Sequence, residues 1–186
     1  MKEIRIHGRG GQGSVVLAEL IAMAAWNQGK FSQAFPYLGG GGERRGAPVQ
    51  SFARISDKPI RLRCRVQTPD YVIVQDPALV ELVDVTRGLK PNGLVLVNGA
   101  VVPAKLLNAG FRVYAVPASE MALKETGRGI PNTPMLGAFA RVTGELSLDS
   151  VLAAVGQKFS GEIRRINEIA VTVGYNSAPG LGREGE

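Results

Sequence analysis

The sequence predicts an α/β protein: a layered domain with a largely parallel sheet, helices on both faces and an inserted antiparallel hairpin. Two observations carry this prediction. A strand-like run at residues 2–7 leads through a glycine-rich turn into a long apolar segment, and three continuous apolar runs from residue 71 onward each precede a helical pattern. Continuous apolar runs are typical of parallel strands that are buried on both faces.

The amino-terminal part contains the first strand–helix unit and the inserted hairpin. We expect a strand at 2–7, a helix at 12–28 that stops at Gly29, and a loop at 31–47, because four consecutive glycines lose too much entropy on ordering. The hairpin is expected to pair 49–55 with 60–66. Ser, Asp and Pro at 56–59 favour the turn between them.

The remainder of the chain alternates strands with helices. The runs "YVIVQD", "GLVLVNG" and "FRVYAVPA" predict strands, followed by short helices up to about 85, at 103–108 and at 119–127. Longer helices are expected at 132–142, at 147–157 with Ser147 as a fair N-cap, and at 163–175. We therefore expect a single domain at 1–176 and a frayed tail at 177–186.

Composition bounds the class of protein. The 186 residues are 45% hydrophobic and 20% charged, no apolar run approaches the roughly 18 residues of a membrane span, and no signal-peptide layout is present, so we expect a cytoplasmic protein. The single cysteine, Cys64, excludes an intrachain disulfide or a cysteine-only metal site and is expected to be a buried thiol. The single histidine, His7, could serve a catalytic triad only if a nucleophile and an acid converged on the first strand.

Positive charge is concentrated in the first third of the chain. Residues 1–70 carry 11 Lys and Arg against 5 Asp and Glu, whereas residues 71–186 carry 11 of each, and the net charge is +6. This asymmetry favours an anionic ligand or partner on the amino-terminal side.

A glycine loop follows the first strand. Gly8, Gly10 and Gly13 have the spacing that lets backbone amides at a helix N-terminus approach a phosphate, although a tight turn that binds nothing remains an alternative. A nicotinamide site would also need a second strand ending in an acidic residue about 20 residues on. After the first helix the chain runs through "GKFSQAFPYLGGGG" with no expected strand and no acidic residue until Glu43, so the dehydrogenase interpretation loses most of its support.

Two arginine clusters extend the basic region. Arg44 and Arg45 follow a four-glycine run and could bind a phosphate or carboxylate through charge-assisted hydrogen bonds, or they could be a solvated pair. Arg61, Arg63 and Arg65 alternate with apolar residues, so in a strand they would share one face, which could dock an acidic partner or face solvent.

The sequence lacks the parts for redox chemistry on its own. It has no cysteine set for an electron-carrying cluster, no thiamine diphosphate motif and no Walker-type Gly-Lys-Ser/Thr. We therefore expect no catalytic residue and no metal ligand in this chain.

Read together, five motifs resemble the gamma subunit of 2-oxoacid:ferredoxin oxidoreductases, in order from about residue 3 to about residue 175. They are "GRGGQG", "GKFSQAFPYLGGGGERRGAPVQSFARISDKPI", "PDYVIVQDPAL", "VDVTRGLKPNGLVLVN" and "NTPMLGAFARVTG". The resemblance implies an α/β subunit of an enzyme that converts a 2-oxoacid and coenzyme A to an acyl-CoA, carbon dioxide and two electrons. It also implies that alpha and beta chains hold thiamine diphosphate and that a delta-type chain holds iron–sulfur clusters and passes electrons to ferredoxin or another acceptor.

The resemblance further implies that this chain contributes to coenzyme A binding. Carried over residue by residue, the implied site comprises Gly8, Gly10, Gly11, Gln12 and Gly13 in the first loop and Glu43, Arg44, Arg45 and Gly46 in the second. Where relatives have Phe-Gly-Pro-Glu-Arg-Arg-Gly, this chain has four glycines and no proline, which leaves pyruvate, branched-chain and aromatic 2-oxoacids such as phenylglyoxylate open.

Two interpretations of another class compete with this one. An autonomous NAD(P)-binding reductase would use the glycine loop for a dinucleotide. A nucleic-acid-binding module would use the basic third of the chain, but aromatic residues are not interleaved with Arg61–Arg65 and no groove-binding motif is present.

Overall fold

The computed structural model describes residues 1–37, 46–107 and 110–180. The strands are β1 (Lys2–Arg9), β2 (Phe31–Tyr37), β3 (Pro48–Ser56), β4 (Tyr71–Val74), β5 (Leu94–Asn98) and β6 (Arg112–Val116). The helices are α1 (Ser14–Asn27), α2 (Leu79–Leu82), α3 (Ala104–Leu107), α4 (Ala118–Thr126), α5 (Asn132–Thr143), α6 (Leu148–Lys158) and α7 (Gly161–Ser177).

These strands form one mixed sheet in the order β2-β3-β1-β4-β5-β6. β1, β4, β5 and β6 run parallel, and β3 is antiparallel to both of its neighbours, β1 and β2. β4 and β5 are buried along their whole length, as their continuous apolar runs predict. The predicted α/β class, the largely parallel sheet and the antiparallel insertion are confirmed.

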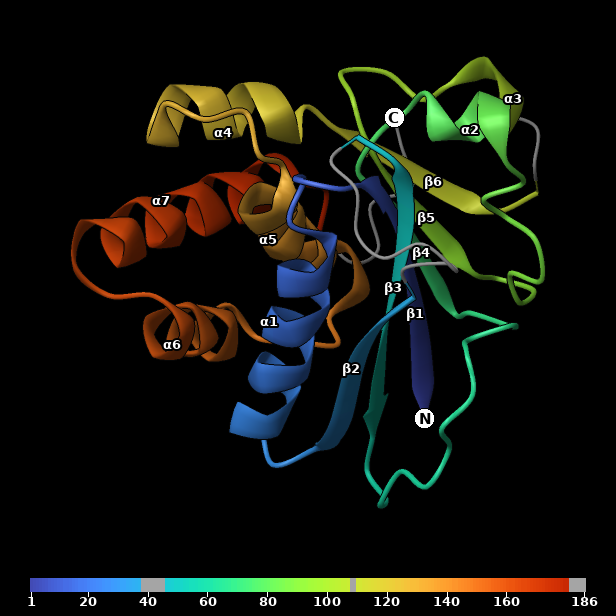
Figure 1. Ribbon diagram of the computed structural model, residues 1–186, viewed down its shortest axis with the longest axis horizontal. Helices are drawn as coiled ribbons and strands as arrows, with labels where there is room; N and C mark the ends of the chain where they lie inside the picture. Colours follow the sequence, from blue (N-terminus) through green and yellow to red (C-terminus); the bar gives the residue numbers. More distant parts are fainter. Residues whose placement is uncertain (38–45, 108–109, 181–186) are drawn as a thin grey trace.

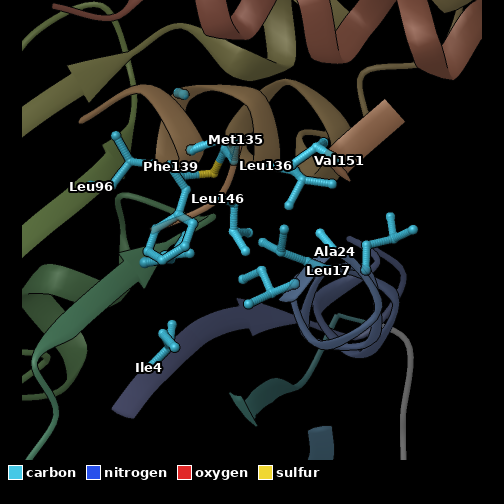
Figure 2. Close-up of a cluster of buried hydrophobic side chains, with 14 of the residues drawn as sticks. Ile4, Leu17, Ala24, Leu96, Met135, Leu136, Phe139, Leu146 and Val151 are labelled. Carbon is cyan, nitrogen blue, oxygen red and sulfur yellow. The ribbon is translucent and has the colours of Figure 1, made fainter. Parts of the chain in front are cut away.

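Helices lie on both faces of the sheet, and the two faces differ in thickness (Figure 1). On one face α1, α4, α5, α6 and α7 enclose the larger core, in which side chains of β1, β5, α1, α5 and α6 meet (Figure 2). On the other face α2 and α3 cover a smaller apolar cluster over β4, β5 and β6. α5 is buried on nearly all sides. The helix that begins at Ser147 is confirmed, since the Ser147 hydroxyl accepts a hydrogen bond from the Ser150 amide at 3.1 Å.

Two predictions about the amino-terminal part are wrong. Residues 31–37 form β2 rather than a loop, and β2 is the hairpin partner of β3. Residues 60–66 form no strand, because both edges of β3 are already paired, with β1 on one side and β2 on the other. The antiparallel hairpin therefore comprises β2 and β3, and Arg61, Arg63 and Arg65 do not lie on one face of a strand.

The segment 60–66 crosses the face of the sheet that α1 does not cover. The fully buried Arg54 guanidinium pairs with Glu3 at 2.9 Å and donates to the Cys64 carbonyl at 2.7 Å, and the Val66 side chain is buried. The Cys64 side chain itself is exposed, so the expectation of a buried thiol is wrong. The charge-assisted hydrogen bonds of Arg54 hold residue 64 against the sheet although this segment pairs with no strand.

A second buried cation lies beside the only histidine. Arg5 donates through Nε to His7 Nε2 at 3.1 Å and through Nη2 to the carbonyls of Val85 and Arg87 at 3.0 and 2.6 Å. Burial, together with the positive charge of Arg5, lowers the pKa of His7 to about 3, and the carboxylate of Asp84 only partly opposes this. His7 is therefore neutral at pH 7 and accepts a hydrogen bond from a guanidinium, which excludes a triad built on this nitrogen.

Two glycines allow α5 and α7 to touch through their backbones. A Cβ atom on Gly137 would lie 2.0 Å from the Val171 carbonyl oxygen, and one on Gly174 would lie 2.0 Å from the Pro134 carbonyl oxygen. Any side chain at either position must push the helices apart. α5 also packs on the rest of the larger core. Its backbone contact with α7 therefore holds the N-terminus of α5 in one position.

We predict that Gly137→Ala lowers the free energy of unfolding by at least about 2 kcal/mol, although alanine favours a helix over glycine, because overpacking at a backbone contact outweighs propensity. Gly129→Ala is the matched control, since its new Cβ would meet nothing closer than 3.6 Å. Chemical denaturation of both variants measures the difference. Equal stability of the two variants would contradict the close helix contact.

We predict that His7 makes the fold less stable as the pH falls. The unfolded chain binds the proton at the ordinary pKa of about 6.5, whereas the folded chain does so only at about pH 3, so this contribution to stability is complete above pH 6.5 and is lost on acidification. Between pH 7 and pH 5 the loss is about 2 kcal/mol. Denaturation of the wild type and of His7→Gln at both pH values measures it, and the same pH dependence in both proteins would contradict the prediction.

Candidate functional site

The glycine loop connects β1 to α1 in a conformation that requires glycine at several positions. A Cβ on Gly8 would lie 2.3 Å from the Ser14 hydroxyl, and one on Gly13 would lie 2.6 Å from Nδ2 of Asn132. Gly11 and Gly13 also have φ values of 96° and 72°, which disfavour other residues. The loop thus leaves its backbone unobstructed at the start of α1.

The side chain of Gln75, directly after the end of β4, forms two hydrogen bonds with this loop and the start of α1. Its Nε2 donates to the Gln12 carbonyl at 3.0 Å, and its Oε1 accepts from the Ser14 hydroxyl. The side chain of Gln12 turns inward as well, since its Oε1 accepts from the Arg9 amide at 2.8 Å. Gln12 therefore shapes the loop.

The root of the second loop is hydrogen-bonded to the first. The Gly10 amide donates to the Ala47 carbonyl at 2.9 Å, and the Gly46 amide donates to the Gly10 carbonyl at 3.0 Å. The Arg9 guanidinium reinforces this join, because it pairs with Asp76 and also donates to the Gly46 carbonyl at 3.1 Å.

Six of the nine residues that the sequence singled out are therefore brought together at one edge of the sheet. They are Gly8, Gly10, Gly11, Gln12, Gly13 and Gly46. Glu43, Arg44 and Arg45 lie outside the described residues, but their segment returns to the sheet at Gly46, beside Gly10.

A pocket of about 400 Å³ opens beside the glycine loop, and sequence reasoning missed most of its lining. α1 and α5 both begin at this pocket, and neither helix has a side-chain cap. Asn132, at the start of α5, is 92% buried, and its Oδ1 accepts from the Thr133 amide while its Nδ2 lies against Gly13. The motif "NTPMLGAFARVTG" contains these residues, but the sequence alone did not give them a role at the site.

The charges around this pocket favour an anion. Arg128 lines it, and among the described residues that line it none is Asp or Glu. Helix N-termini carry partial positive charge, and free amide groups there bind phosphates well. At α5 the Thr133 amide is bonded to Asn132 and Pro134 has no N–H, so the start of α1 is the better donor of free amides. Val16, Phe159 and Ile166 form apolar walls, so the pocket can hold an anionic group attached to an apolar chain.

A second crevice, of about 330 Å³, lies at the carboxyl ends of β4, β5 and β6. Asn98 at its floor donates to the Gln75 carbonyl at 2.9 Å and to the Ser119 hydroxyl at 2.8 Å. Asp76 and Glu120 line the same crevice, so it suits a phosphate less well than the pocket between α1 and α5.

The sheet order also bears on the dinucleotide interpretation. β2 does follow α1, contrary to expectation, but β3 lies between β1 and β2 in the sheet. Since β3 is antiparallel, it begins at this edge with Pro48, and β2 ends in Tyr37. The acidic residue that would hold a nicotinamide ribose is therefore absent from the ends of both described strands.

Within residues 1–37, 46–107 and 110–180, no three His, Cys, Asp or Glu side chains gather as a metal site. No helix in this described part of the chain is long and apolar enough to cross a membrane.

Comparison with known proteins extends the resemblance over nearly the whole chain. The sequence model of the pyruvate ferredoxin/flavodoxin oxidoreductase family matches residues 3–177. Pyruvate synthase subunit PorC of Methanosarcina barkeri is 56% identical over 83% of this chain and 85% of its own length. The common gamma subunit of the pyruvate/ketoisovalerate oxidoreductases of Thermococcus kodakarensis is 46% identical over 95% of this chain and 96% of its own.

Two solved structures have a similar fold. The pyruvate oxidoreductase subunit PORC of Thermotoga maritima superposes with a TM-score of 0.81 at 39% identity and covers 94% of this chain and 95% of its own. The 2-oxoglutarate:ferredoxin oxidoreductase of Magnetococcus marinus, solved with 2-oxoglutarate, coenzyme A and succinyl-CoA bound, has a TM-score of 0.77 at 21% identity. This match covers all of this chain and 33% of the Magnetococcus chain and indicates a shared fold.

The uncapped helix N-termini, the joined loops and these comparisons lead to one assignment: the chain belongs to the pyruvate ferredoxin/flavodoxin oxidoreductase family and is the gamma subunit of a 2-oxoacid:ferredoxin oxidoreductase.

Proposed function

We propose that this gamma subunit binds coenzyme A for a complex that converts a 2-oxoacid and coenzyme A to an acyl-CoA, carbon dioxide and two electrons. In this proposal alpha and beta chains hold thiamine diphosphate, a delta-type chain holds the iron–sulfur clusters, and ferredoxin or another carrier accepts the electrons. We place the complex in the cytoplasm and expect no role for nucleic acid.

One observation carries the proposal: two uncapped helices begin at a single pocket that contains an arginine and no acidic residue among its described lining. Coenzyme A bears a pyrophosphate and a 3′-phosphate at one end and a long pantetheine arm at the other. The helix N-termini and Arg128 suit the phosphates, and the apolar walls suit the arm. The bound coenzyme A of the Magnetococcus marinus enzyme is in keeping with this assignment.

Within that site we assign the pyrophosphate to the Gly8–Gly13 loop and the remaining phosphate charge to Arg44 and Arg45. The hydrogen bonds between Gly10 and Gly46 hold the start of the loop and the root of the arginine segment side by side. Arg45 immediately precedes Gly46 in the sequence, and an arginine can bind a phosphate through charge-assisted hydrogen bonds.

We propose that the thiol of coenzyme A reacts outside this subunit. Among the described residues, Asp76 pairs with Arg9, and His7 is neutral and lies on the opposite face of the sheet. We therefore assign the gamma subunit a binding and orienting role, with the reacting carbon held by sister chains. Acyl transfer is then assisted because one reactant is held in place.

We also propose pyruvate as a 2-oxoacid of the complex, with branched-chain acids as further substrates. The Methanosarcina barkeri relative is a pyruvate synthase subunit, and the Thermococcus kodakarensis relative is common to pyruvate and ketoisovalerate oxidoreductases. A subunit that serves two oxidoreductases does not itself select the 2-oxoacid. The selection then belongs to the sister chains.

We predict that Arg44→Ala/Arg45→Ala in the assembled complex raises the KM for coenzyme A at least about tenfold, because two charge-assisted phosphate contacts are lost. Decarboxylation of the 2-oxoacid, measured by carbon dioxide release in a single turnover without coenzyme A, is expected to be unchanged. Arg61→Ala/Arg63→Ala removes the same charge from exposed positions and is the control. Unaltered coenzyme A kinetics in the first variant would rule out the arginine assignment.

We predict that Asn132→Asp weakens coenzyme A binding to the complex at least about tenfold. The aspartate keeps the oxygen that accepts from the Thr133 amide but replaces the Nδ2 donor with a negative oxygen that repels a phosphate. Asn176→Asp makes the identical change at an exposed position of α7 and is expected to bind normally. Equilibrium titration with coenzyme A measures both affinities, and equal affinities would place the phosphates away from Asn132.

A further inference from the structure

A second pocket lies on the opposite face of the sheet from the proposed coenzyme A site. Its volume is about 280 Å³, and β1, β2, β3, α2 and Arg65 contribute to its lining. Ile4 and Ile6 of β1 point into the larger core beside α1, so the alternate residues Arg5 and His7 point the other way, and His7 lines this pocket. The pocket therefore shares β1 with the glycine loop but not the face of the sheet.

His7 presents a hydrogen-bond donor at this pocket. A guanidinium can only donate, so the nitrogen of His7 that faces Arg5 must be the unprotonated acceptor. The neutral ring then carries its proton on Nδ1, and no acceptor within the described part of the chain lies within hydrogen-bond distance of that nitrogen. The His7 side chain is 97% buried, but Nδ1 is not one of the fully buried unpartnered atoms of the described residues, so this donor is accessible from the pocket.

Positive charge surrounds the same pocket. The Arg65 guanidinium lies 4.3 Å from the centre of the Tyr37 ring, and both residues line the pocket. Among the described residues, no carboxylate lies within 4.0 Å of the guanidinium of Arg65 or of Arg5. Asp84 acts on Arg5 and His7 only through space. An anion in this pocket would meet one cation, Arg65, and no acidic residue in the described lining, while Arg5 lies behind His7.

The remaining walls limit the size and character of the occupant. Val49 of β3 and Leu79 of α2 are apolar, and Gln50 supplies one further amide. A volume of this size is at the small end of the range for small-molecule sites, which begins near 300 Å³. A multiply charged phosphate ester would leave its other oxygens against apolar walls, whereas a carboxylate on a compact apolar group matches both surfaces.

We propose that this pocket binds a small monocarboxylate with a compact apolar body, such as a short branched or aromatic acid, at a site separate from that for coenzyme A. The carboxylate accepts from His7 Nδ1 and pairs with Arg65, which is held on the Tyr37 ring. The apolar body packs between β3 and α2. This inference goes beyond the proposed function and does not depend on it.

The single histidine makes the test direct. We would titrate the full-length chain with benzoate and follow the imidazole resonances of His7 by NMR, with benzamide as the uncharged analogue of the same shape. Benzoate is expected to give a saturable shift and benzamide none. Arg65→Gln is expected to weaken benzoate binding at least tenfold. Arg61 is an exposed arginine on the same segment, and Arg61→Gln is expected to leave benzoate binding unchanged.

Three results would overturn the proposal. They are the absence of a saturable shift, an equal response to benzamide, and an equal loss of affinity in Arg65→Gln and Arg61→Gln. Competition decides whether the sites are separate: coenzyme A that displaces benzoate would assign the pocket to the coenzyme A site and contradict the proposal. Equilibrium dialysis of labelled benzoate against the assembled complex completes the test. Benzoate binding to the complex would support a small-molecule ligand in this pocket. Loss of benzoate binding in the complex would mean that a sister chain fills the pocket, and this would contradict the proposal.

Discussion

The chain leaves β1 and enters α1 within four residues, Gly10–Gly13, and this short turn constrains the rest of the site. The turn is possible because Gly8 lets Ser14 and Gln75 approach the strand and because Gly13 makes room for Asn132. Gln75 in turn ties β4 to the loop. The N-terminus of α1, the root of the second loop and the start of α5 are therefore fixed relative to one another before any ligand arrives.

The two faces of the sheet are stabilised by different means. The face under α1 and α5 is a deep apolar core, with α5 and α7 in backbone contact through Gly137 and Gly174. The opposite face of β1 and β3 buries Arg5 and Arg54, which bind carbonyl groups and one carboxylate in place of water. Burying a cation is tolerable only with such hydrogen bonds. One strand, β1, leads into the glycine loop at its end and contributes His7 to the second pocket on its side.

The sequence predicted the parallel part of the sheet well because β4 and β5, at its centre, are buried on both faces and are marked by continuous apolar runs. It predicted the antiparallel part less well. The alternation of Arg61, Arg63 and Arg65 resembles a strand, but both edges of β3, its predicted partner, are taken by β1 and β2, and which edges are paired depends on the whole topology. β2 was missed because the four glycines that follow it led us to predict a loop over the whole segment 31–47. The glycine loop was evident from spacing alone, whereas Asn132 joins it only through the packing of α5, which no local pattern encodes.

The central claim is that this edge of the sheet holds the phosphates of coenzyme A while sister chains carry out the redox chemistry. A structure of the assembled complex with coenzyme A bound tests it most directly. The account predicts the pyrophosphate within hydrogen-bond distance of the backbone amides of Gly10–Gly13, with Asn132 beside it. Coenzyme A held entirely by other chains, with this edge turned away from it, would contradict the account.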